Sequence, residues 1–208
     1  MKAEELLRKY AAGERDFSGM DLQGINLAKA NLVEANFKGS NLTGANLREV
    51  ILHEACLEDA NLSEADLIGA DLINANLKRA NLSQVNLRGA CLRGVAGDHA
   101  NLEGANLKFA DLSSSDWENV NLTNANLEGA NLCFTNLQNA ELAGVNLSYA
   151  ILISTNFKGV TKFGELFLDE WALPTCNACI DHIIGPDGTV DKYARFNYFW
   201  FWGKYILS

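Results

Sequence analysis

A large apolar residue recurs at every fifth position from Phe17 to Phe157, and no other feature constrains the fold as strongly. The series has 29 positions in one unbroken frame, of which 24 hold Leu and three hold Phe. Trp117 and Gly97 occupy the other two. A period of five matches neither the 3.6-residue helix nor the two-residue strand. It predicts a chain that turns a corner every five residues.

The two residues before each large one are restricted as well. Two positions earlier stands Ala in 17 units, Val in five, and Ser or Thr in four. Such small residues fit a narrow interior that one large side chain per side already fills. Directly before the large residue, Asn or Asp occupies 23 of the 29 positions, and these side chains hydrogen-bond nearby backbone in turns. The pattern predicts an all-β solenoid whose interior is packed with Leu.

Many units read Ala, then Asn or Asp, then Leu, as in 30–32, 65–67 and 130–132. They resemble the A(D/N)LXX unit of the pentapeptide-repeat family, and the match covers about 144 of the 208 residues. Residues 5–17 also look like the lead-in of cyanobacterial-type members. The resemblance implies a right-handed quadrilateral β-helix with four sides per coil. About seven coils would form a rod of roughly 34 Å at the usual strand spacing.

The N-terminal residues predict a helical cap over 1–15, ahead of a β-helix over 16–160. Residues 3 to about 12 favour a short helix with Leu6, Leu7, Tyr10 and Ala11 on one face and Gly13 at its end. The first coil of a solenoid exposes apolar surface and unpaired backbone groups. We therefore expect this helix to cover it.

Residues 161–208 predict a C-terminal cap of mixed α and β structure. Apolar residues recur at helical spacing in 163–172, and 183–190 favours a tight turn between two short extended pieces. The aromatic tail, 193–207, holds eight aromatic residues. It fits three roles: packing over the cap, pairing two chains, or resting at a membrane interface, where Trp and Tyr are favoured.

Chemistry-bearing residues are few. Cys176 and Cys179 precede His182, but a structural zinc site needs four ligands and no second motif supplies the fourth. Plain cap residues, a metal site and a disulfide all remain open for these cysteines. No phosphate loop or nucleophile motif is present, and a tube filled with Leu has no room for a substrate pocket. We expect no enzyme activity, no catalytic residue, no metal and no cofactor.

Counting by twenty places Gly97 one coil before Trp117 on the same side. We predict that the indole extends into the volume that a side chain at position 97 would fill. The alternative is a local bulge, with Gly97 in a backbone conformation open only to glycine.

Composition limits the classes of partner and the cellular location that we expect. The net charge is −9, and residues 16–160 carry 17 acids against nine bases, which disfavours direct nucleic-acid binding. No secretory signal or apolar run near 20 residues is found, so we expect no membrane span. Five scattered cysteines suit a reducing compartment, and we expect a cytoplasmic protein.

One side of the rod differs from the others. Its outward apolar residues are Val33, Ile51, Ile73, Cys91, Cys133, Phe134, Ile151 and Ile153. Apolar residues gathered on one face favour a contact surface for a protein partner or a second copy, although single exposed ones are ordinary. Trp200 and Trp202 in the aromatic tail are a second candidate contact.

These features favour a non-enzymatic interaction scaffold with an unidentified protein partner. Two alternatives remain. Some pentapeptide-repeat proteins are acidic dimeric rods that imitate DNA and bind a type II topoisomerase such as gyrase, although the acids here do not form long columns. The aromatic tail could instead attach the protein to a membrane surface.

Overall fold

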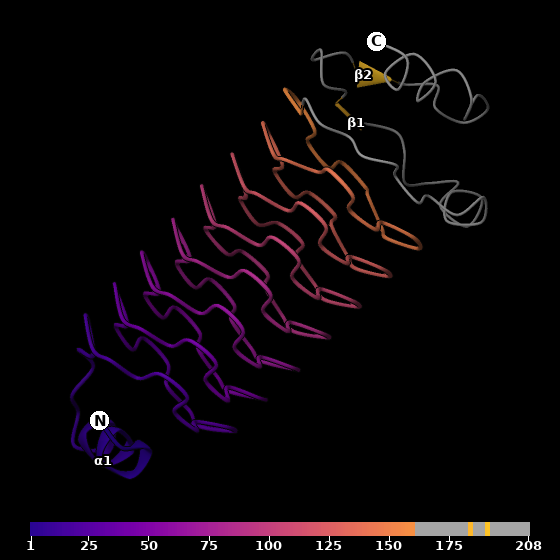
Figure 1. Ribbon diagram of the computed structural model, residues 1–208. Helices are drawn as coiled ribbons and strands as arrows, with labels where there is room; N and C mark the ends of the chain where they lie inside the picture. The colour runs from indigo at the N-terminus through magenta and orange to yellow at the C-terminus, as the bar shows by residue number, and fades with distance from the viewer. Residues whose placement is uncertain (161–182, 185–189, 192–208) are drawn as a thin grey trace.

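The computed structural model describes residues 1–160 together with two short strands, β1 (Ile183–Ile184) and β2 (Val190–Asp191). Helix α1 (Ala3–Ala11) lies at the N-terminal end of a stack of coils (Figure 1). Parallel bridges join each residue before a large apolar one to the residue twenty positions later, from Asp16↔Asn36 to Asn136↔Asn156. Each coil therefore contains four five-residue units, and the predicted solenoid is confirmed.

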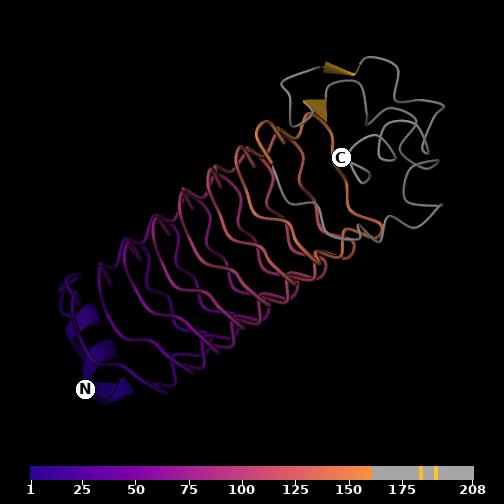
Figure 2. The same cartoon turned by 45° about the horizontal axis from the view of Figure 1, so that its top comes forward.

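Backbone hydrogen bonds join neighbouring coils in both directions. The amide of Leu22 donates to the carbonyl of Asn41 at 2.7 Å, and the amide of Asn41 donates back to Met20 at 2.9 Å. This pairing repeats along the coils, which close around one common axis when seen from a second direction (Figure 2). Strand-type pairing between coils leaves unpaired strand edges only at the ends of the stack.

A tight turn follows each large apolar residue. The second residue after it has a positive φ in all 29 units, between 54° and 73°. A following amide closes the turn, as when Ala35 donates to the carbonyl of Leu32 at 3.1 Å. Positive φ at the third residue of a turn favours glycine, and 11 of the 17 glycines stand at this position.

The Asn and Asp side chains connect both along and between the coils. Oδ1 of Asn31 accepts a hydrogen bond from the amide of Val33 at 3.3 Å, as the sequence predicts. Across coils, Nδ2 of Asn81 donates to Oδ1 of Asn61 at 3.0 Å, and Asn121 donates to Asn101 in the same way. The repeat position therefore builds amide ladders that run parallel to the axis.

The interior is filled by the large apolar residues and the small ones two positions before them. Trp117 is 1% exposed, and a Cβ added to Gly97 would lie 2.1 Å from its Cε3. Nε1 of the indole donates to Oγ of Ser115 at 2.8 Å. Gly97 has no positive φ, and its amide keeps the regular bond to Asp116 at 2.7 Å. The indole thus occupies the space left by glycine inside a regular coil.

Helix α1 packs through one stripe only. Leu6 is fully buried and Tyr10 is partly buried, whereas Leu7 is 38% exposed. Our expectation that Leu7 and Ala11 share the buried face was wrong, because each is rotated by about 100° from Leu6 or Tyr10. Gly13 ends the helix as predicted: its amide donates to Tyr10, and the amide of Glu14 donates to Lys9.

Strands β1 and β2 pair antiparallel, with Ile184 opposite Val190. They lie where the sequence predicts two short extended pieces, and the C-terminal cap as a whole stays a prediction. The predicted helix at 163–172, the turn residues 185–189, Cys176, Cys179 and the aromatic tail lie outside the described residues. Within the described part, no helix is long and apolar enough to cross a membrane.

Candidate interaction surface

We number the four units of each coil as sides one to four, starting from the unit that contains Phe17. The eight predicted surface residues all lie on the fourth side, which contains Leu32 and Leu152. Phe134 is 64% exposed and Ile151 is 38% exposed. The other six are half-buried: Val33, Ile51, Ile73, Cys91, Cys133 and Ile153. Trp200 and Trp202 lie outside the described residues.

Contacts between coils follow a fixed register. The residue after one Leu lies against the residue before the Leu of the next coil, as the pair between His53 Nε2 and Asp71 Oδ2 shows at 2.7 Å. The same register places Val33 next to Ile51, Ile73 next to Cys91, and Cys133 next to Ile151 on adjoining coils. Polar pairs stand between these apolar ones: His53–Asp71, then Arg93–Asp111 at 4.0 Å. The eight residues therefore form separate clusters rather than one unbroken column.

The largest apolar cluster lies on the last three coils. It contains four of the eight predicted residues and, in addition, Phe109 and Tyr149, each 53% exposed. Both stand at the positive-φ position on the corner between the third and fourth sides, and Phe134 stands on the next corner. We call this set the distal patch: Phe109, Cys133, Phe134, Tyr149, Ile151 and Ile153. Sequence reasoning missed Phe109 and Tyr149 because it compared sides and ignored the corners between them.

The distal patch is exceptional within residues 1–160. Of the six exposed large apolar residues in that range, four belong to it, and the other two, Met1 and Leu7, lie at the N-terminal end. On the fourth side, the sixth and seventh coils present no charged residue. An uncharged surface that exposes several large apolar side chains usually marks a contact site.

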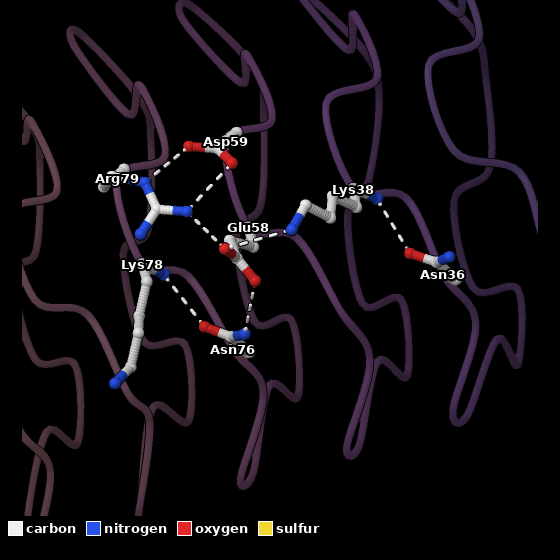
Figure 3. Close-up of polar contacts among 7 residues, drawn as sticks. All are labelled: Asn36, Lys38, Glu58, Asp59, Asn76, Lys78 and Arg79. Carbon is white, nitrogen blue, oxygen red and sulfur yellow. Dashed lines mark hydrogen bonds and ion pairs between the residues drawn. The ribbon is translucent and has the colours of Figure 1, made fainter.

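The first side carries charges that neutralise one another (Figure 3). Lys38 Nζ lies 3.1 Å from Glu58 Oε1, and Arg79 binds both Glu58 and Asp59. Hydrogen bonds from Lys38 and then Arg79 hold the pKa of Glu58 below its ordinary value. The hydrogen bond to Asp98 raises the pKa of Lys78.

The acids do not form a long column on any side. Seven of the 17 acids in residues 16–160 pair with Lys or Arg, and an eighth, Asp71, pairs with His53. The other nine are dispersed over the first, second and fourth sides. No described group of three or more His, Cys, Asp or Glu residues could hold a metal ion.

Comparison with known proteins identifies the repeat. The family described as pentapeptide repeats matches in eight copies, over residues 16–48, 55–94, 100–133 and 125–161. The chain belongs to the pentapeptide-repeat family. Members of this family form right-handed quadrilateral β-helices, and the coils here have the corresponding four units.

The chain is similar to proteins of known structure, and three of them are described here. HetL, involved in heterocyst differentiation regulation in the cyanobacterium Nostoc sp. strain PCC 7120, is 29% identical over 91% of this chain and 99% of its own, with a TM-score of 0.43. The Nostoc protein alr5209 is 34% identical over 58% and 80%, with a TM-score of 0.30. QnrB1, a plasmid-mediated fluoroquinolone resistance protein, is 17% identical over 73% and 79%, with a TM-score of 0.49. No curated protein sequence matches the chain.

Proposed function

We propose that this protein is a non-enzymatic scaffold that holds a protein partner against the distal patch. The observation that carries the proposal is the exposure of Phe134, Ile151 and their apolar neighbours where the fourth side of the sixth and seventh coils has no charged residue. Because Leu and Trp side chains fill the interior of the coils, the outer sides are the surfaces available for binding.

The coil geometry supports this role. Hydrogen bonds between coils fix each outward side chain on a grid of about 4.8 Å along the axis. A preorganised surface loses little conformational freedom when a partner binds. The aromatic tail, including Trp200 and Trp202, is the proposed second contact, and a reducing cytoplasmic setting is the proposed location.

The test compares the full-length protein with Ile151→Asp. A charge in the apolar cluster should remove proteins that co-purify with the wild type, because an unpaired carboxylate would be desolvated on binding. The matched control is Asn121→Asp, which adds the same charge at the same repeat position on the opposite side. Quantitative mass spectrometry of the captured proteins measures the difference. An identical set for wild type, Ile151→Asp and Asn121→Asp would contradict the proposal.

Ile73→Asp tests whether the contact extends toward the middle of the rod. Retained capture with this variant, together with loss for Ile151→Asp, would confine the contact to the last coils. Purified gyrase in a supercoiling assay tests the topoisomerase alternative, and vesicle sedimentation tests the membrane alternative. Inhibition in the first assay, or vesicle binding that Ile151→Asp leaves unchanged, would favour those alternatives over the proposed scaffold.

A further inference from the structure

The distal patch is small compared with an ordinary protein interface. Its most distant members along the axis, Phe109 and Tyr149, stand two coils apart, so the cluster extends only about 10 Å along the axis at the usual strand spacing. A stable dimer buries about 800 Å² on each partner. Six side chains on three coils supply only part of such an area. The patch therefore fits a short segment, from this chain or from a protein partner, better than a second globular surface.

A tethered segment needs much less contact area than a free partner. Linking two binding groups in one chain gives an effective concentration that reaches about the millimolar range for short flexible connections. A contact too weak to assemble two molecules can therefore hold a segment of the same chain.

The chain supplies a segment of fitting chemistry. The solenoid ends at Val160, seven residues after Ile153 and just past the first side of the following coil. The aromatic tail, 193–207, begins 33 residues later, and this connection can span up to about 3.3 Å per residue. Its only charged residues are Arg195 and Lys204. With +2 in the tail and −9 overall, the remainder carries −11, so net charge favours approach of the tail to the rod. Contact with the patch itself rests on burial of apolar area.

We propose that the aromatic tail docks on the distal patch of its own chain and covers it until a protein partner displaces it. The proposed docking is argued from the exposed patch and the composition of the tail alone. Competition between the tail and a protein partner rests on the proposed function. Aromatic side chains are suited to this contact because each buries a large apolar area with few rotatable bonds.

Tryptophan emission from the full-length chain tests the docking. Trp117 is buried, so Trp171→Phe leaves Trp200 and Trp202 as the reporters that a change at the patch could affect. In that background, Phe134→Asp should shift the emission to longer wavelength and increase acrylamide quenching. The matched control is Asn124→Asp, at the same positive-φ position of the same coil on the opposite side. Asp tolerates this conformation better than Phe, so backbone strain cannot imitate the expected change.

Other occupants give different results. Equal quenching in the parent, Phe134→Asp and Asn124→Asp would overturn the proposal. Protection that grows with protein concentration, with dimers in sedimentation velocity, would assign the tail to a second copy. Protection seen only with phosphatidylcholine and phosphatidylserine vesicles would assign it to a membrane. Either result would also overturn docking within one chain. Loss of partner capture in Ile151→Asp is measured separately, so the proposed function can stand when docking fails.

Discussion

At the scale of single residues, a large side chain in one coil fills the space that a small residue leaves in the coil before it. Gly97 leaves the place of one Leu empty, and the indole of Trp117 fills it from the next coil. Ser115 supplies the acceptor that the buried indole N–H requires, and its hydroxyl in turn donates to the carbonyl of Leu112. Both polar groups are therefore satisfied within an apolar core.

Trp117→Leu should destabilise the protein by about 3 kcal/mol, because a Leu leaves a cavity beside Gly97. Gly97→Leu alone should also destabilise it, because its side chain would overlap the indole. The double variant restores an ordinary Leu column and should recover much of the loss. Urea unfolding of the four proteins measures the coupling. Strictly additive losses would show that the two positions do not share one volume.

At the scale of elements, helix α1 is attached by a narrow stripe and a defined end. Leu6 contacts the core, and the hydroxyl of Tyr10 donates to the carbonyl of Val33 at 3.0 Å. Arg15 places its guanidinium 3.9 Å from the centre of the Tyr10 ring and donates to the Tyr10 carbonyl. The helix thereby covers part of the first coil, where no earlier coil can pack.

Leu6→Ala should cost about 2–4 kcal/mol, because it removes a fully buried side chain from this contact. Leu7→Ala is the matched control one residue away, and its effect should stay within about 0.5 kcal/mol because Leu7 is exposed. Thermal unfolding compares them. Equal losses would mean that both leucines pack against the solenoid.

At the scale of the whole molecule, charge pairs reinforce the contacts between successive coils. Hydrogen bonds from Lys38 and Arg79 lower the pKa of Glu58, and those from Arg79 lower the pKa of Asp59. A carboxylate with a lowered pKa stabilises the folded state above its unfolded pKa, and the effect is lost as pH falls through the folded pKa. The rod should therefore lose part of its stability in acid.

Glu58→Gln should lower the melting temperature at pH 7, because the charge on the acceptor is lost. The difference in melting temperature between Glu58→Gln and the wild type should become smaller as pH falls below about 4.3, the ordinary pKa of glutamate. Glu103→Gln is the matched control at the same repeat position on the second side, in no ion pair of the described part. A gap for Glu58→Gln that is constant between pH 7 and pH 3 would contradict this assignment.

The period of five was sufficient to predict the coils, the buried positions and the Asn side-chain bonds, because the turn geometry repeats in 29 units and Asn or Asp stands in 23 of them. The turn conformation could have been found too, since glycines gather at one repeat position. The ion pairs that divide the fourth side were harder to foresee, because they join residues 18 positions apart. Leu7 was misplaced because a two-turn helix offers too few apolar residues to fix its buried stripe.

The twenty-residue bridge spacing has a consequence for how such a chain tolerates insertions and deletions. Adding or removing twenty residues would change the length of the rod and keep Ile151 aligned with Cys91 and Ile73. Adding five residues before Phe109 would keep every Leu inside, yet carry the whole distal patch a quarter-turn around the axis. Insertion or deletion of single repeat units could thus turn a binding face toward another side of the rod and leave the packing of the core unchanged.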